Sequence, residues 1–254
     1  MDVKRYVIVP DLQIPHEDSR FVKNLFGYIK DSQPFGVIFI GDNVDCTAPA
    51  RWNKATAEEF SGSLQHEFDK WRAYGEVLRQ NFSGFVGVHF GNHEKRIRSY
   101  LLRDAPAFSS LRSLRLENLL SLDELGFKQL PDHYDIAPGW VTHHGDYASI
   151  SDIAGRTAAN YSNKIGKSVI CGHTHRAGII AESTGYNGKL KTRYGVEVGH
   201  GMLESKAHYT NGVMNWQKAF ASLEVVDNGR FVIPQVHYAR PNGSFVIEGR
   251  MYGN

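Results

Sequence analysis

Cysteine is scarce in this sequence of 254 residues, where only Cys46 and Cys171 are present. Two cysteines are too few for a disulfide framework, so we expect a protein of a reducing compartment, with each cysteine a small buried residue at a strand end. Long apolar runs are lacking too, since no stretch approaches the roughly 18 apolar residues of a membrane span. Residues 1–6 also contain no apolar signal core. We therefore predict a cytoplasmic protein that does not enter a membrane.

Net charge is small as well, because 29 lysine and arginine residues face 27 aspartate and glutamate residues, which gives +2. This balance gives no global reason to expect nucleic acid or an anionic membrane as a partner. Residues 94–125 are helical in pattern and locally basic, with cations at Lys95, Arg96, Arg98, Arg103, Arg112 and Arg115. Two interpretations remain open: a positive lip that attracts a phosphate-bearing substrate, or a solvated helical face.

The pattern of apolar residues predicts an α/β fold. β-branched runs at residues 6–10 and 37–40 flank a helical pattern capped by Ser19, which indicates a parallel strand pair joined by a crossover helix. Further helices are expected over roughly residues 57–80 and 151–163, and further strands over residues 85–90, 127–131 and 139–142. After Ala177 the pattern changes to strands, with hairpin turns at residues 185–188 and 227–229. No repeat or linker interrupts the chain, so we predict one domain, residues 1–254.

Metal-ligating side chains follow five of the apolar runs. They occur at Asp11, Gly41-Asp-Asn-Val-Asp45, Gly91-Asn-His-Glu94, His143-His-Gly145 and Gly172-His-Thr-His175. In open α/β sheets, ligands bind outside the carboxyl ends of the strands. A single histidine pair after a strand is more often a packing feature, but five such strand ends in one chain point to a metal site.

The types of these side chains indicate which metals they suit. The Asp42 carboxylate has two oxygens and can bridge two cations, Asn92 offers an amide oxygen, and His144, His173 and His175 offer imidazole nitrogens. Such mixed ligands suit borderline divalent ions, with Mn²⁺ expected first and Fe, Ni, Co or Zn as alternatives. Two such ions about 3.5–4 Å apart can hold a bridging hydroxide for in-line hydrolysis of a phosphate ester.

The ordered set of motifs from Asp11 to His175 resembles the calcineurin-like metallophosphoesterase superfamily. That resemblance implies a four-layer α-β-β-α sandwich of two mixed sheets, with a dinuclear metal centre at the carboxyl ends of the strands. By position, it implies that the first ion is held by Asp11, Asp42 and His175, and the second by Asp42, Asn92, His144 and His173. It also implies that His93 is the histidine that assists the leaving group without binding metal, and that Asp45 is an acceptor that orients a ligand or its loop.

One motif departs from the family. The family has Asp-x-His where this chain has Asp11-Leu12-Gln13. Gln13 is a weaker, neutral donor, so either it ligates the first ion weakly, or water takes the place, or His16 substitutes. We place Gln13 near the first ion and expect activity to need added metal. The family's histidine before glycine selects His144 rather than His143, which should point the other way in an extended segment.

These patterns predict a metal-dependent hydrolase of phosphate esters, most directly a phosphodiesterase. The sequence leaves open whether its substrate is a nucleotide, a nucleic acid, a nucleotide-linked lipid or a small diester. A DNA or RNA nuclease is one alternative. Another is a non-catalytic scaffold, because residues 11–16 are similar to the first loop of the retromer scaffold subunit. That subunit lacks the histidine of the Gly-Asn-His block, whereas His93 is present here. Oligomeric state is left open by the sequence.

Overall fold

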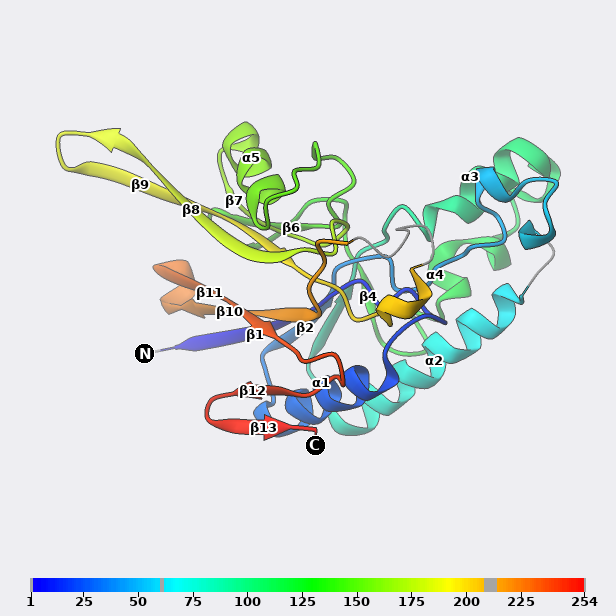
Figure 1. The fold of residues 1–254 in the computed structure, drawn as a ribbon, viewed down its shortest axis with the longest axis horizontal. Coiled ribbons are helices and arrows are strands. Elements are labelled where there is room, and N and C mark those ends of the chain that lie inside the picture. Colours follow the sequence, from blue (N-terminus) through cyan, green and yellow to red (C-terminus); the bar gives the residue numbers. More distant parts are fainter. Residues whose placement is uncertain (1, 60–61, 208–213, 254) are drawn as a thin grey trace.

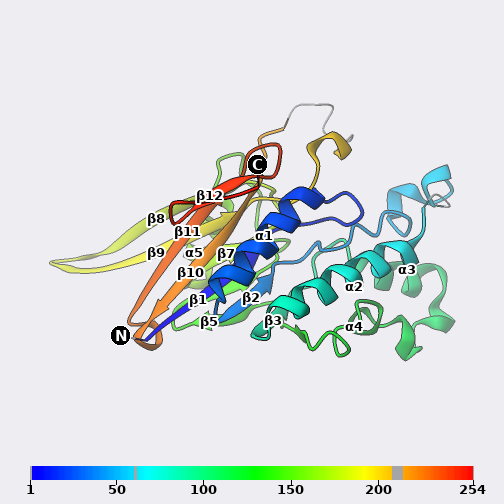
Figure 2. The same ribbon diagram turned by 90° about the horizontal axis from the view of Figure 1, so that it is seen from below.

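In the computed structural model, which describes residues 2–59, 62–207 and 214–253, the chain forms two large β-sheets with helices on their outer faces (Figures 1 and 2). The first sheet has the strand order β11 (Phe231–Tyr238), β10 (Ala219–Val226), β1 (Val3–Val9), β2 (Gly36–Phe39), β3 (Phe85–Val88) and β4 (Lys128–Gln129). The second has the order β5 (Tyr134–Ala137), β6 (Trp140–His143), β7 (Ser168–Cys171), β9 (Lys189–Val198) and β8 (Ala177–Tyr186).

Both sheets are mixed. Strands β1 to β4 run parallel, whereas β10 pairs antiparallel with β1, and β11 pairs antiparallel with β10. In the second sheet β6, β7 and β9 run parallel, and β5 and β8 form antiparallel edges. The predicted parallel pair with a crossover helix is confirmed by β1 and β2, and the two predicted hairpins are confirmed by β8–β9 and β10–β11.

The core between the layers follows from side-chain alternation along buried strands. On β1, Val7 and Val9 join the apolar cluster under the helices, while Tyr6 and Ile8 join the cluster between the two sheets. Successive side chains of a strand point to opposite faces, so a strand that is buried on both faces reads as an unbroken apolar run. This geometry explains why the sequence of β1 shows no polar alternation.

Helices cover both outer faces, which completes the predicted four-layer α/β architecture. Helices α1 (Ser19–Ser32) and α2 (Leu64–Asn81) pack on the first sheet, and α5 (Arg156–Ile165) packs on the second (Figure 1). The first cap differs from expectation: Asp18, not Ser19, precedes α1, and its carboxylate accepts a hydrogen bond from the backbone N–H of Arg20 at 3.1 Å. A carboxylate at this position satisfies an N–H that the helix itself leaves free.

The other helices are shorter than their patterns suggested. Helix α2 begins only after Ser63, which caps it, and α5 begins after Gly155, whose φ is 81°. Over residues 94–125, Pro106 follows the end of α3 (Lys95–Asp104), and 3-10 turns lead to α4 (Leu116–Leu119). Local capping and turn residues therefore end helices that the apolar periodicity alone would extend.

The C-terminal residues form a two-stranded hairpin, β12 (Phe245–Ile247) and β13 (Arg250–Tyr252), that packs against α1 (Figure 2). Phe245 belongs to the cluster under the helices. Within the described residues, no helix is both long enough and apolar enough to cross a lipid bilayer. The single domain over residues 1–254 stays a prediction.

Candidate metal centre

The five polar motifs follow strands of both sheets. Asp11, the loop 41–45 and the loop 91–94 follow β1, β2 and β3, while His144 and the loop 172–175 follow β6 and β7. The carboxyl ends of the parallel strands in both sheets lie toward α3, at the opposite end of β1 from the N-terminus (Figure 1). The structure brings these side chains together in one cluster, which has two halves.

The first half of the cluster is centred on Asp42. Ligand atoms of Asp42, His144 and His173 all lie within 4.8 Å of one another. Nε2 of His144 is 3.2 Å from Oδ2 of Asp42 and 3.1 Å from Oδ1 of Asn92. Nδ1 of His144 donates a hydrogen bond to the carbonyl oxygen of Ile40, so this bond fixes the tautomer that leaves Nε2 facing the other ligands.

The second half of the cluster is centred on Asp11. Oδ2 of Asp11 is 3.4 Å from Nε2 of His175 and accepts a hydrogen bond from the backbone N–H of His173 at 2.8 Å. Gln13 lies beside them, with its Nε2 donating to Nε2 of His175 at 3.0 Å. Rotation of this amide about its last bond would present the oxygen instead. All seven predicted metal ligands are thus brought together.

Unpartnered polar atoms indicate that this cluster can hold cations. Oδ1 of Asp11 and Nδ1 of His175 are buried without a hydrogen-bond partner among the described residues, and Asp11 and Asp42 are almost completely inaccessible to solvent. A buried polar atom without a partner costs about 1–3 kcal/mol, and two carboxylates in one buried cluster also repel each other. Divalent cations remove both penalties. The residues present therefore fit divalent cations with mixed carboxylate, imidazole and amide ligands.

Charge inside the cluster perturbs its titration. Burial opposes ionisation of Asp42, but the imidazoles of His144 and His93 outweigh this effect and lower the pKa of Asp42. Burial likewise opposes the charged form of His144, but the Asp42 carboxylate outweighs it and raises the pKa of His144 to about 10. For His173, burial and then the neighbouring His144 lower the pKa. A cation that binds here must displace the proton of His144, so binding releases protons.

Backbone strain is concentrated around the same atoms. Twelve described residues other than glycine have a positive φ, and five of them are Gln13, Asp42, Cys46, His173 and His175. Such residues cost of order 1 kcal/mol each and persist where the surroundings hold them in place. The left-handed backbone conformation at these residues turns nearby side chains of a loop toward one point, which an extended or helical backbone would not do.

Two buried glutamates hold the strained loops, and neither was a predicted site residue. Glu94 is fully buried and accepts hydrogen bonds from the backbone N–H groups of Gly91 and of residues 42–44. Glu197 accepts from the hydroxyl of Thr174, at 2.8 Å, and from two N–H groups at the start of α5. Thr174 separates the two histidines of its loop. The acidic residue after the Gly-Asn-His block was a visible signal for Glu94, whereas nothing in the sequence marked Glu197.

His93 lies beside the metal ligands. Its Nδ1 donates to Oδ1 of Asp45 at 2.9 Å, and its Nε2 is 3.6 Å from Oδ2 of Asp42. Burial opposes the charged form, but Asp42 and Asp45 outweigh it and raise the pKa of His93. Nη2 of Arg96 donates to Nε2 of His93 at 2.8 Å, a contact that requires Nε2 to be unprotonated. Protonation of Nε2 and the Arg96 contact are therefore alternatives.

A cavity of ≈ 660 Å³ opens beside His93. Gln13, Asp45 and His93 line it next to the cluster, and Trp52, Arg96 and Lys206 line it further out. His16 also lines this cavity, with Nε2 3.9 Å from Oδ2 of Asp45. Arg96 of the basic stretch thus faces the site, which supports the interpretation of a positive lip for this residue.

Three other histidines near the motifs lie outside the cluster. His89 is buried and pairs through Nε2 with the hydroxyl of Thr142, as expected for a packed side chain. The ring of His143 packs at a tilt against that of Tyr161, with 4.7 Å between the ring centroids, which is on the side of the strand opposite to His144, as expected for consecutive residues of an extended segment. His200 forms isolated β-bridges with Asp11 and Lys218, and its ring centroid lies 5.6 Å from that of His175.

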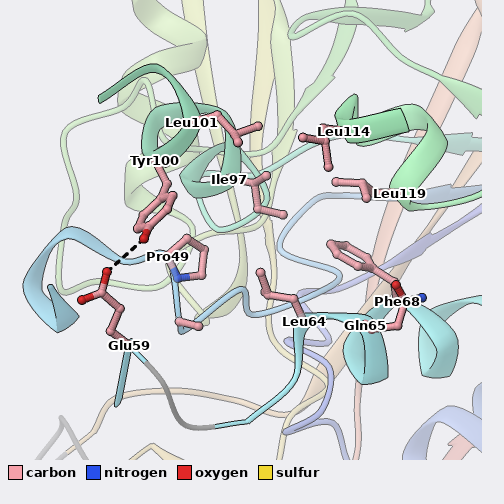
Figure 3. A pocket seen from close by; sticks show the side chains of 11 residues that line it. Pro49, Glu59, Leu64, Gln65, Phe68, Ile97, Tyr100, Leu101, Leu114 and Leu119 are labelled. Carbon is pink, nitrogen blue, oxygen red and sulfur yellow. Dashed lines mark hydrogen bonds between the residues drawn. The ribbon is translucent and has the colours of Figure 1, made fainter. Parts of the chain in front are cut away.

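A second cavity, of ≈ 380 Å³, lies between α2, α3 and the chain before α4 (Figure 3). Leu64, Ile97 and Leu114 point into it, and the hydroxyl of Tyr100 donates to Glu59 across its mouth. Its lining is mostly apolar and includes none of the metal-ligating side chains. We therefore assign it to the packing of α3 rather than to the metal centre.

Comparison with known proteins gives two kinds of match. No model of a known protein family matches the chain. The Gene 54 proteins of Mycobacterium phages L5 and D29 are 40% and 37% identical to it, and each alignment covers 98% of both chains. The crystal structure of Vps29 from Chaetomium thermophilum superposes with a TM-score of 0.50 at 12% identity, covering 98% of each chain. This structural match shows a shared fold, that of the calcineurin-like metallophosphoesterases.

Proposed function

This chain belongs to the family of the mycobacteriophage Gene 54 proteins, and we propose that its members are metal-dependent phosphoesterases that hydrolyse phosphodiesters. The observation that carries the proposal is the convergence of the seven predicted ligand side chains beside the His93–Asp45 pair, at the strand ends of a metallophosphoesterase fold. A fold alone does not specify an activity, whereas a cluster of this composition does specify a chemistry.

Two divalent ions fit the two halves of the cluster. Asp11, Gln13 and His175 would hold the first, and Asn92, His144 and His173 the second, with the Asp42 carboxylate shared between them. Mn²⁺ is the ion we expect first, with Fe, Co, Ni or Zn as alternatives. When bound, the ions supply Lewis-acid stabilisation of the phosphoryl oxygens and an activated water as nucleophile.

The remaining steps fall to side chains of the chain itself. Asp45 holds Nδ1 of His93, which turns Nε2 toward the cavity beside Asp42. The Asp45 carboxylate, which accepts a hydrogen bond from Nδ1, favours the protonated ring, and His93 gives the proton on Nε2 to the leaving-group oxygen as its bond to phosphorus breaks. Arg96, released from Nε2 in that state, is free to pair with a phosphoryl oxygen.

A non-catalytic scaffold of the same fold is the second candidate. The observation in its favour is Gln13, which stands where the family has a histidine and is a weaker ligand. The presence of His93 with its hydrogen bond to Asp45 favours the enzyme, because a scaffold would have no use for a positioned acid. A nuclease is the same chemistry on a longer substrate.

The test is hydrolysis of bis-p-nitrophenyl phosphate and of p-nitrophenyl phosphate by metal-stripped protein titrated with Mn²⁺ and, in parallel, with the other four ions. Asn92→Ala removes a ligand and His93→Ala removes the acid. His66→Ala, an exposed histidine on α2, is the matched control. We expect diester cleavage that returns with metal and falls by about 10²–10⁴-fold in His93→Ala, while His66→Ala behaves as wild type.

Each result separates the candidates. Cleavage of the monoester alone would replace the phosphodiesterase by a phosphomonoesterase. No cleavage with any of the five metals, from wild-type protein with a normal unfolding transition, would refute the enzyme and favour the scaffold.

A further inference from the structure

An exposed tryptophan stands beside the catalytic cavity. Trp52 lies in the 3-10 turn Arg51–Asn53 and is 61% exposed, and the guanidinium of Arg96 lies over its ring, 4.8 Å from the ring centroid. A single exposed apolar residue needs no explanation in itself. Trp52, however, lines two cavities, and this position suggests a role in binding.

The two cavities share Trp52 and Arg96. The first, of ≈ 660 Å³, reaches His93. The other is a cationic cavity of ≈ 470 Å³, distinct from the apolar one of Figure 3; it reaches Asn92 and is also lined by Arg51, Lys95, Ser99 and Arg103. A phosphodiester carries two esterified groups, one on each side of its phosphorus. Two hollows that both adjoin the metal cluster, separated by an aromatic ring, provide a place for each group.

The charge of the cationic cavity matches a polyanion. Four cations line it, namely Arg51, Lys95, Arg96 and Arg103, and no carboxylate does. Carboxylates outside the cavity pair with Lys95 and with Arg103. Among the described residues no carboxylate pairs with Arg51 or Arg96, so neither charge is neutralised, although Arg96 donates to the carbonyl oxygen of Asp45 and to Nε2 of His93.

The turn that carries Trp52 is fixed before any ligand binds. The side-chain amide of Asn53 donates to the carbonyl oxygen of Thr47 at 2.8 Å, and the hydroxyl of Thr56 donates to the carbonyl oxygen of Asn53 at 2.7 Å. Asn53 itself is buried. Because the backbone of this turn is already ordered, it loses little conformational entropy when a flat partner stacks on the Trp52 ring.

We propose that Trp52, with Arg51 and Arg96, forms a nucleotide subsite, in which a base stacks on the tryptophan and the cations bind the phosphates attached to it. The substrate class is then a nucleoside-bearing phosphodiester presented as a single strand. A flat π-face beside a track of cations suits single-stranded nucleic acid because every base can stack and every link carries a phosphate. This inference rests on the proposed function, since it assigns that function its substrate.

The first test compares two diesters, bis-p-nitrophenyl phosphate and thymidine 5′-(p-nitrophenyl) phosphate, with Mn²⁺-reconstituted protein. Trp52→Ala should lower the ratio of kcat/KM for the nucleoside diester to kcat/KM for the simple diester by about tenfold, which is typical of losing one stacked base. Trp52→Phe should restore most of the ratio, because it keeps a ring. Tyr186→Ala, an 87% exposed aromatic residue at the end of β8, is the matched control and should leave the ratio unchanged.

The second test measures binding without turnover, by fluorescence anisotropy of a labelled thymidine pentanucleotide with phosphorothioate links. Wild-type protein with Mn²⁺ should bind it, and Trp52→Ala should weaken binding about tenfold. Arg51→Ala should reduce the slope of log K against log salt by about 0.7, the value for one phosphate contact on a single strand.

The outcomes distinguish this inference from the proposed function. Binding that depends on Trp52, without hydrolysis of any diester, would support the subsite and refute the enzyme. Normal hydrolysis of the simple diester, with neither the ratio nor the binding changed in Trp52→Ala, would overturn the subsite and leave the enzyme standing.

Discussion

Replacement of Gly172 by alanine should weaken metal binding at the half of the cluster that is centred on Asp11, without unfolding the protein. A Cβ at this position would lie 2.2 Å from Oδ1 of Asp11 and 2.6 Å from the side chain of Ile40. The φ of Gly172 is not in the left-handed region, so alanine strains the backbone little and acts through these contacts. The obstacle is therefore the carboxylate that we assign to the first ion.

The size of the effect follows from the overlap. A Cβ contact shorter than 3.0 Å is essentially never adopted, so the carboxylate oxygen must move away from 2.2 Å to at least that distance. The hydrogen bond from the N–H of His173 to Oδ2 resists this movement. Overpacking of this kind costs about 1–3 kcal/mol. If the carboxylate relieves it by leaving its ligand position, affinity for the first ion falls by about 10–100-fold.

The assay is calorimetric titration of metal-stripped protein with Mn²⁺, with thermal unfolding measured at each metal concentration. Gly27→Ala in α1 is the control, because its Cβ would have no contact closer than 3.8 Å. We expect the weaker of the two binding events, which we assign to the ion beside Gln13, to weaken by about 10–100-fold in Gly172→Ala, and metal to stabilise this variant less than wild type against heat. Unchanged affinity at both sites in Gly172→Ala would refute the placement of Asp11 as a ligand.

Three further predictions concern buried charges and hydrogen bonds. Burial raises the pKa of Glu67 from 4.5 to about 7, so between these pH values the folded chain binds more protons than the unfolded chain and its stability falls as pH rises. Glu67→Gln should remove up to about 3 kcal/mol of this fall, measured by urea unfolding at a series of pH values. A variant whose stability falls with pH as steeply as that of wild type would contradict this. Lys218 and Asp18 form a buried ion pair at 2.7 Å. In a double-mutant cycle, Lys218→Met should lower the free energy of unfolding by about 3 kcal/mol in the wild-type background and by much less when Asp18→Asn is also present. Equal losses in the two backgrounds would show that the pair is not coupled. Thr174→Val removes the hydroxyl that donates to Glu197 and should weaken Mn²⁺ binding about tenfold by calorimetry, whereas wild-type affinity would show that this contact does not position the histidines.

Much of the fold could be predicted because buried parallel strands have a distinctive sequence. The apolar runs at β1 and β2 were recognisable by their β-branched residues, and the turn at residues 185–188 by its glycines. Helix ends were harder, since they depend on single hydrogen bonds. Asp18 and Ser19 are both good caps, and only the structure shows that Asp18 receives the bond. The strand β5 was missed because it is only four residues long and half exposed.

The candidate site shows a similar division. Side chains that follow strands, such as Asp42 and His144, could be grouped because parallel strands end at one edge of a sheet. Glu197 could not be grouped with them, since it lies inside β9 and contacts the site only through the hydrogen bond that it accepts from the hydroxyl of Thr174. The contacts of Trp52 and Arg96 were also out of reach, because they join a turn to a helix more than 40 positions along the chain. Side-chain contacts between loops depend on tertiary geometry that periodicity does not encode.

The most direct test of the account is the number of metal ions bound per chain. Metal-stripped protein is reconstituted with excess Mn²⁺ and desalted, and its manganese is measured by elemental analysis against protein concentration, with Asp42→Asn alongside. We predict two ions per wild-type chain, and at most one for Asp42→Asn, because that carboxylate is shared. No manganese retained by folded wild-type protein, or two ions retained by Asp42→Asn, would contradict the metal centre on which the proposed function depends.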